Sequence, residues 1–147
     1  LAAEIEAWRP DVVVSLGVAD GRDAITPERV AINLDLSPVA DNAGDVRLDR
    51  PIRTGAEAAW LTDLPPRAIV EAIHAAGLPA RESLSAGAFV CNHLFYETKA
   101  RLAGSPVRVG FIHVPQLPEM ADGDSPSMPL EDMVRGIRVA LEAIVRE

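Results

Sequence analysis

The spacing of hydrophobic positions changes along the chain and predicts helices and strands in alternation. Leu1, Ile5 and Trp8 recur at helical spacing with no cap and no signal peptide before them, so the sequence opens within a helix. The apolar run from Val12 to Leu16 is rich in β-branched residues, which is typical of a parallel strand buried on both faces. Because an α/β domain rarely begins with a lone helix, we expect an N-terminal strand to be missing before Leu1.

The stretch after this strand is less regular. The segment from Glu28 to Leu36 alternates partly between apolar and polar residues and fits a strand or an extended segment. It leads into residues 37–63, which are polar and contain several glycines and prolines. A connection longer than most is a candidate for function.

The second half of the chain contains the more regular patterns. A helix is predicted from Pro65 and Pro66, which suit a first helical turn, to a stop at Gly77. Its apolar stripe consists of Ile69, Val70 and Ile73. After it we predict a short strand near 81–85, a helix from about Cys91 to Leu102 that Gly104 stops, and a strand from Val107 to Val114.

A last helix is predicted from about Pro129 to Arg146. Glu131 and Asp132 lie in its first turn, where their charges complement the helix dipole. Its predicted inward face consists of Val134, Ile137, Leu141 and Ile144.

Strands that alternate with helices predict an α/β fold, a three-layer αβα sandwich with a mostly parallel sheet. Residues 1–147 fit one domain, because this length buries a sizeable core and no second-domain linker is visible. Sheets of this kind bind ligands beyond the carboxyl ends of their strands. Cys91 and His113 both follow or close a predicted strand, so they can meet in one crevice.

Composition excludes several classes of partner. A net charge of -8 without clustered Lys or Arg gives no driving force for nucleic acid or anionic membrane surfaces. No apolar stretch approaches the roughly 20 residues that a bilayer requires. A single cysteine excludes an internal disulfide framework, and we therefore expect a cytoplasmic protein.

The segment SAGAFVCNH places the only cysteine, Cys91, at the start of a predicted helix. Backbone N–H groups without intrahelical partners and the positive end of the helix dipole favour a thiolate there, and the same N–H groups could hold an oxyanion. The alternative interpretation is an inert thiol that packs as a small hydrophobic residue.

A thiol nucleophile needs an imidazole and a group that orients it. His74 lies in the last turn of a helix, where a dipole contact explains it, and His93 points to another side of the helix from Cys91. His113, at a strand end, is the better base, although a structural histidine is the ordinary interpretation. Glu28 lies just after a proline and beside an apolar segment, which is a poor place for a merely solvated charge, though that alternative stays open.

Two other kinds of site have weaker support. The loop GVADGR is not a GxGxxG fingerprint and no helix pattern follows it at once, so a dinucleotide site is not expected. Cysteine, histidine and glutamate are zinc ligands, but no closely spaced Cys/His pair and no fourth ligand are evident, so no metal is expected.

Three segments together resemble one known family, pyroglutamyl peptidase type I, also called pyrrolidone-carboxylate peptidase. GVADGRDAITPERVAIN is similar to the segment around the family's catalytic glutamate, SAGAFVCNHLFYE to that around its cysteine, and GFIHVPQLPEM to that around its histidine. The resemblance covers nearly the whole chain and implies a phosphorylase/hydrolase-like αβα fold. The family's usual first strand and its aromatic loop of the GFxPF type have no counterpart in this sequence.

The resemblance implies Cys91 as nucleophile, His113 as general base and then acid, and Glu28 as the group that orients His113. The implied reaction releases N-terminal pyroglutamyl residues from peptides through a thioester, with no metal or organic cofactor. The family commonly forms homo-oligomers, often tetramers, so we expect one here. A catalytically silent relative that only binds pyroglutamate or peptide N-termini is the alternative.

A pyroglutamyl pocket should be flat and apolar, with hydrogen bonds for the lactam. The family pattern implies Phe89 and Val90 as pocket walls, with Val39 and Val18 as further members, and plain core packing is the alternative. The chain departs from the family at Val18, where many members carry a glutamine, and at Pro38, where many bacterial members carry an arginine. These departures bear on substrate affinity more than on the three catalytic positions.

Overall fold

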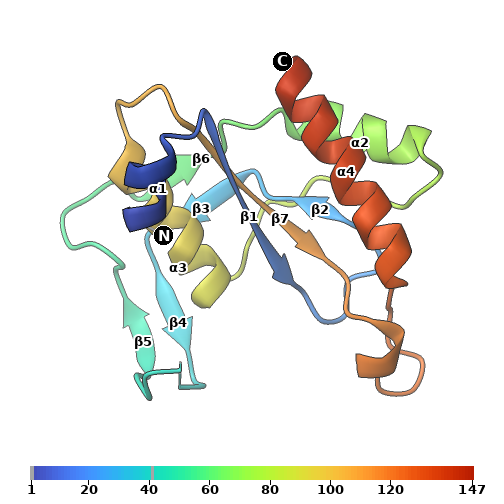
Figure 1. The fold of residues 1–147 in the computed structure, drawn as a ribbon. Coiled ribbons are helices and arrows are strands. Elements are labelled where there is room, and N and C mark those ends of the chain that lie inside the picture. The colour runs from blue at the N-terminus through green and yellow to red at the C-terminus, as the bar shows by residue number, and fades with distance from the viewer. Residues whose placement is uncertain (1, 41) are drawn as a thin grey trace.

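The computed structural model of the protein describes residues 2–40 and 42–147 (Figure 1). Within these residues one helix precedes a run of six strands, after which come two helices, a last strand and two further helices. In order they are α1 (Ala2–Trp8), β1 (Val12–Val18), β2 (Thr26–Pro27), β3 (Val30–Ile32), β4 (Asp35–Ser37), β5 (Arg47–Arg50), β6 (Ala59–Leu61), α2 (Pro66–Ala75), α3 (Val90–Leu102), β7 (Arg108–Val114), the 3-10 helix η1 (Pro118–Met120) and α4 (Leu130–Arg146).

A parallel ladder between β1 and β7 forms the centre of the fold. It runs over seven residue pairs, from Val12 opposite Arg108 to Val18 opposite Val114. Strand β2 adds to the other edge of β7 in antiparallel orientation, and two antiparallel pairs, β3 with β6 and β4 with β5, lie outside this sheet. The long ladder therefore fixes the direction in which the sheet presents its carboxyl ends.

Alternate residues of β7 face two separate hydrophobic clusters, because successive side chains of a strand point to opposite faces. Val109 and Phe111 pack with Phe95 and Tyr96 of α3, whereas Ile112 packs in the cluster that contains buried residues of α2 and α4. Figure 1 accordingly shows α3 on one side of the central strands and α2 with α4 on the other. The predicted α/β class with helices on both faces is confirmed.

Helices α2 and α3 begin and end close to their predicted limits. Pro66 is the first residue of α2, where its missing N–H has no intrahelical partner to lose. Gly77 and Gly104 follow α2 and α3 with φ of 76° and 80°, a conformation that glycine adopts without steric cost. None of the described helices has the length and apolar character needed to span a bilayer.

The prediction for the inward face of α4 is wrong at two positions. Val134 is 59% exposed and Leu141 is 42% exposed, and the buried residues are Met133, Gly136, Ala140 and Ile144. A Cβ atom at Gly136 would lie 2.3 Å from Cδ1 of Ile25, so only the face with the small residue can approach the core this closely. The buried face of α4 is therefore the one on which Gly136 lets the helix approach Ile25, and not the face with the most apolar residues.

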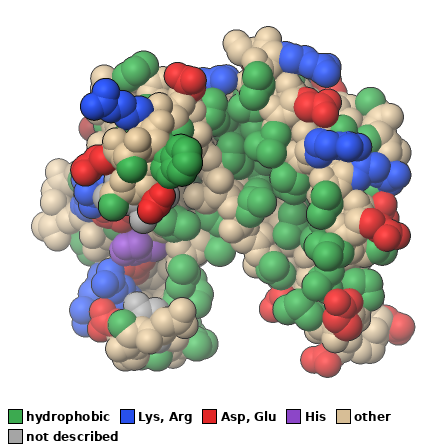
Figure 2. Space-filling view, viewed as in Figure 1, with side chains coloured by type: hydrophobic (Ala, Val, Ile, Leu, Met, Phe, Trp, Pro, Cys, Tyr) green, Lys and Arg blue, Asp and Glu red, His purple; other side chains and the backbone are tan. Residues whose placement is uncertain are grey.

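The prediction that β1 is buried on both faces is also wrong. Leu16 and Val18 are 52% and 51% exposed, and β7 is the strand with the nearly continuous burial. Within the described residues, β1 pairs on one edge only. Figure 2 shows hydrophobic side chains over the face where β1 and α4 lie. The exposed large hydrophobic residues of these two elements include Leu16, Val18, Val134, Leu141 and Val145.

Three less regular segments differ from their predicted form. The segment from Glu28 to Leu36, predicted as a strand or an extended segment, contains two short strands, β3 and the start of β4, separated by a bend. Residues 37–63, predicted as loop, contain β5 and β6. Residues 81–85 form no strand and touch the sheet through isolated parallel bridges such as Glu28 with Ser83. Short strands of two to four residues carry too few positions for periodicity to identify them.

A Gly110→Ala substitution tests how tightly β7 packs. A Cβ atom at Gly110 would lie 2.2 Å from Cδ1 of Leu64 and 2.8 Å from Oγ1 of Thr62, so we expect overpacking to lower the free energy of unfolding by about 1–3 kcal/mol. Urea denaturation followed by circular dichroism measures this change. As a control, Arg138→Ala on the exposed side of α4 should change it by less than about 0.5 kcal/mol; equal effects would contradict the interpretation.

Candidate active site

Cys91 lies over the carboxyl end of the central ladder. Gly17 of β1 is opposite His113 of β7, and a Cβ atom built on Gly17 would lie 3.0 Å from Sγ of Cys91. Because Gly17 carries no side chain, the thiol can approach the ladder directly above the His113 pair. The thiol is half-buried, so it is not sealed in the hydrophobic core.

His113 and Glu28 form a buried pair beneath the thiol. Nδ1 of His113 lies 2.7 Å from Oε1 of Glu28, and the side chains are 4% and 0% exposed. The backbone N–H of Glu28 donates to the carbonyl oxygen of Phe111 (2.9 Å), which holds the carboxylate beside β7. The ring of Phe111 packs against the imidazole with centroids 4.7 Å apart. Since Glu28 occupies Nδ1, Nε2 is the nitrogen that remains for Cys91.

The pKa of His113 reflects opposing effects. Burial, the largest single effect, disfavours the charged ring, but hydrogen bonds with Cys91 and Glu28 and the charges of both partners outweigh it, so the pKa of His113 is raised above 6.5. A raised folded-state pKa stabilises the folded protein fully below the ordinary histidine pKa. This contribution is lost as the pH rises through the raised pKa.

The first turn of α3 is fixed to a neighbouring segment by Asn92, the residue after Cys91. Asn92 is fully buried, its Oδ1 accepts from the N–H of Ile32 (2.9 Å), and its Nδ2 donates to the carbonyl oxygens of Ile32 (2.9 Å) and Leu34 (3.1 Å). Three hydrogen bonds to one backbone segment satisfy most of what an amide side chain can form. The position of Cys91 therefore depends on the segment between β3 and β4.

The other two histidines are held by structural contacts. Nδ1 of His93 lies 2.9 Å from Oδ1 of Asp35, which also accepts a hydrogen bond from Arg47 through Oδ2 (3.0 Å). Nε2 of His74 lies 2.8 Å from the carbonyl oxygen of Ala80. The described contacts of these two histidines are therefore with Asp35 and with the backbone, and not with Cys91.

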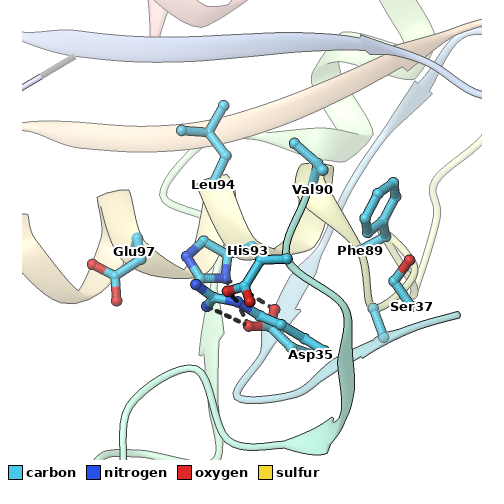
Figure 3. Close-up of a pocket in the computed structure, with 10 residues that line it drawn as sticks. Asp35, Ser37, Phe89, Val90, His93, Leu94 and Glu97 are labelled. Carbon is cyan, nitrogen blue, oxygen red and sulfur yellow. Dashed lines mark hydrogen bonds and ion pairs between the residues drawn. The ribbon is translucent and has the colours of Figure 1, made fainter. Parts of the chain in front are cut away.

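A cavity of about 350 Å³ lies between α3 and the β4–β5 pair. Figure 3 shows Phe89 at one end of it, Glu97 at the other, and His93 near Asp35 between them. It is lined by Asp35, Ser37, Asp45, Arg47, Ala88, Phe89, Val90, His93, Leu94 and Glu97. The predicted pocket residues Val18 and Val39 are not among its lining residues, and both are exposed.

Three residues at the site were not identified from the sequence: Gly17, Arg22 and Asn92. Nη1 of Arg22 donates to Oε1 of Glu28 (2.6 Å), and its Nη2 donates to the carbonyl oxygen of Ser85 (3.0 Å). Arg22 was visible only as a charge in the GVADGR loop, and Asn92 only as the neighbour of Cys91. Their partners are distant in sequence, so no local pattern reveals them.

No group of three or more His, Cys, Asp or Glu side chains within residues 2–40 and 42–147 is arranged to hold a metal ion. The arrangement of Glu28, His113 and Cys91 suits proton transfer, because a carboxylate holds one ring nitrogen and the thiol interacts with the same ring.

The family model described as pyroglutamyl peptidase matches residues 1–147, the whole chain. The chain belongs to the pyroglutamyl peptidase family. It is therefore a cysteine peptidase and a hydrolase, as the resemblance of its three segments predicted.

Relatives and solved structures agree with this family. The chain is 45% identical to a pyrrolidone-carboxylate peptidase of Vibrio parahaemolyticus over 142 residues, which are 96% of the chain and 67% of the relative. It is 49% identical to that of Levilactobacillus brevis, over 93% of the chain and 69% of the relative. The chain thus spans about two thirds of the length of these relatives.

The fold is that of solved family members. The crystal structure of pyroglutamyl peptidase I from Bacillus amyloliquefaciens matches with a TM-score of 0.96 and 38% identity, over 99% of this chain and 71% of that one. Pyrrolidone carboxyl peptidase from Thermococcus litoralis matches with a TM-score of 0.92 and 32% identity, over 99% and 70% of the two chains.

Partner substitutions should lower the pKa of His113. Because contacts with Cys91 and Glu28 raise it, Cys91→Ala and Glu28→Gln should each lower it, as measured by NMR titration of the ring protons. His74→Gln, remote from this pair, is the control and should leave the titration of His113 unchanged. A His113 pKa that is the same in all four proteins would contradict the described contacts.

A Gly17→Ala substitution should displace the thiol. The added Cβ would meet Cζ of Phe111 at 2.9 Å and Sγ of Cys91 at 3.0 Å. We expect the rate of alkylation by iodoacetamide to change and peptidase kcat/KM to fall about 100-fold, since a displacement near 1 Å has effects of this order. Ser15→Ala, two residues earlier on β1, removes atoms instead of adding them and should leave both rates near wild type.

Proposed function

We propose that this protein removes N-terminal pyroglutamyl residues from peptides by nucleophilic catalysis with Cys91, His113 and Glu28. The observation that supports this most directly is the buried 2.7 Å contact between His113 and Glu28, with Cys91 against the same ring. A carboxylate on Nδ1 fixes the tautomer and orientation of the imidazole, which leaves Nε2 to exchange a proton with the thiol.

In the first half of the proposed reaction, the thiolate of Cys91 attacks the carbonyl carbon that joins the pyroglutamyl group to the next residue. A C–S bond forms and the carbonyl oxygen becomes an oxyanion. When the tetrahedral species collapses, the C–N bond breaks and imidazolium His113 gives its proton to the leaving amine. The products of this half are a thioester on Cys91 and a peptide shortened by one residue.

In the second half, neutral His113 takes a proton from water, and the resulting hydroxide attacks the thioester carbonyl. The C–S bond breaks, free pyroglutamic acid leaves and Cys91 is again a thiolate beside an imidazolium. Glu28 remains ionised throughout and stabilises the imidazolium in each half. No metal or organic cofactor enters these steps.

The first turn of α3 supplies the proposed oxyanion site. Cys91 is the second residue of α3, so the N–H groups of that turn point toward the reacting carbonyl. Loss of one such donor typically raises the barrier by about 2.7–4 kcal/mol. The attachment of Asn92 to Ile32 and Leu34 keeps this turn in place.

The pyroglutamyl ring is proposed to bind beside Phe89 and Val90, which immediately precede the nucleophile. Both are apolar, partly exposed and at the start of α3, so they can cover a flat lactam ring. Val39 and Val18 are proposed as further wall residues. A neutral lactam N–H suits this apolar surface, whereas a free N-terminal ammonium would lose its hydration there without a partner.

Assembly and location stay predictions. The exposed apolar residues on β1 and α4 suit contact with a second copy, as the family resemblance implies. A cytoplasmic location is expected from the single cysteine.

The full-length protein should hydrolyse pyroglutamyl-aminomethylcoumarin and not prolyl-aminomethylcoumarin, whose free ammonium is excluded. Cys91→Ala should lower kcat by at least about 10³-fold, because nucleophile and base act as a unit. His74→Gln, whose histidine contacts only the backbone near α2, should keep the wild-type rate. Release of coumarin at an unchanged rate by Cys91→Ala would overturn the proposal, and pyroglutamate binding without turnover would indicate the binding-only alternative.

A further inference from the structure

Arg22 joins three groups around the buried carboxylate. Its Nη1 donates to Oε1 of Glu28 (2.6 Å) and to Oγ1 of Thr26, and its Nη2 donates to the carbonyl oxygen of Ser85 (3.0 Å). The side chain is only 22% exposed, so solvent screens these contacts weakly. Arg22 comes from the loop after β1 and reaches both the Glu28 segment and the segment that leads to α3.

We propose that Arg22 is a positioning residue of the peptidase: it orients the Glu28 carboxylate in its ionised form and limits the proton affinity of the Glu28–His113 pair. This inference rests on the proposed function of that pair in catalysis.

The hydrogen-bond pattern of Glu28 supports the orienting part. Arg22 and His113 bond to the same oxygen, Oε1, at 2.6 and 2.7 Å. The other oxygen, Oε2, is buried and has no hydrogen-bond partner among the described residues. The buried negative charge is therefore stabilised from one side only, and without Arg22 a single imidazole would have to hold it. A buried carboxylate with so few partners is free to change its rotamer, which would turn Oε1 away from the imidazole.

The charges of the cluster support the proton-affinity part. Within the pair, His113 comes from β7. Two further ionisable groups contact the pair: Arg22, from the loop after β1, contacts Glu28, and Cys91, from α3, contacts His113. Arg22 is the permanent cation among them, since guanidinium does not lose its proton in proteins. A cation on the oxygen that also holds the imidazolium makes protonation of the ring less favourable. Arg22 thereby keeps His113 able to release its proton to the leaving amine.

A second ion pair provides a matched control. Arg81 pairs with Asp23, the residue next to Arg22, and both side chains are more than half exposed. This pair also bridges the loop after β1 and the segment before α3, but it does not contact Glu28 or His113. Its removal weakens the attachment between the same two segments without changing the charge at the carboxylate.

The experiment compares Arg22→Gln, Arg22→Lys and Arg81→Gln with the full-length wild type. In Arg22→Gln we expect kcat to fall roughly 10- to 100-fold at neutral pH with KM within about 2-fold, since the substrate does not contact Arg22. The basic limb of the pH profile of kcat/KM should move to higher pH by roughly one unit, and the His113 pKa measured by NMR should rise by the same amount. Arg22→Lys, which retains the charge, should keep the limb near its wild-type position, and Arg81→Gln should resemble the wild type in every readout.

An unchanged basic limb and an unchanged His113 titration in Arg22→Gln would overturn this proposal, even if the variant were less stable, because a structural role alone moves neither. Equal shifts in Arg81→Gln would overturn it as well. A wild-type protein that turns over no pyroglutamyl substrate would instead overturn the proposed function. The NMR titration does not require turnover, so it separates the two failures.

Discussion

The parallel pairing of β1 with β7 is the constraint on which the site depends. This ladder sets the register that places Gly17 opposite His113, and the alternation along β7 turns Phe111 and His113 toward α3 while Ile112 turns toward α2 and α4. A shift of the register by one residue would send His113 to the other face, away from Cys91. The hydrophobic cores on both faces oppose such a shift, so the packing that stabilises the fold also keeps the imidazole in place.

A buried carboxylate is the most demanding group in this arrangement. Glu28 loses all contact with water, and two nitrogen donors on one of its oxygens compensate for that loss. The contacts of the ring with Cys91 and Glu28 raise the pKa of His113 against the effect of burial, which lowers it. Local stability and acid–base chemistry are thus two consequences of one cluster of charges. Arg22 stabilises the buried Glu28 carboxylate, and through the same contact it is proposed to lower the proton affinity of His113.

Cys91, the proposed nucleophile, is positioned from a different direction. Asn92 attaches the first turn of α3 to the backbone between β3 and β4, while Gly17 leaves room for the sulfur at the end of β1. Cys91 therefore meets His113 at the junction of two independently supported elements. Movement of the helix start would break three hydrogen bonds of the fully buried Asn92 side chain, so these bonds oppose it.

The sequence by itself determined the longer helices and indicated which groups are candidates for catalysis. The apolar stripe of α2 and the bounding residues Pro66, Gly77 and Gly104 fixed two helices through local conformational preferences. The segments around Glu28, Cys91 and His113 indicated the family. These features depend on neighbours along the chain, which a sequence displays directly.

Only the tertiary structure decided which surfaces are buried and which distant residues pair. Helix α4 is apolar on more than one side, and its contact with Ile25 through Gly136 selected the buried face. Strand β1 has the composition of a buried strand, yet Leu16 and Val18 are exposed because burial depends on what packs against a strand and not on its own residues. The contacts of Arg22 with Glu28 and Ser85 likewise join loops that only the folded chain brings together.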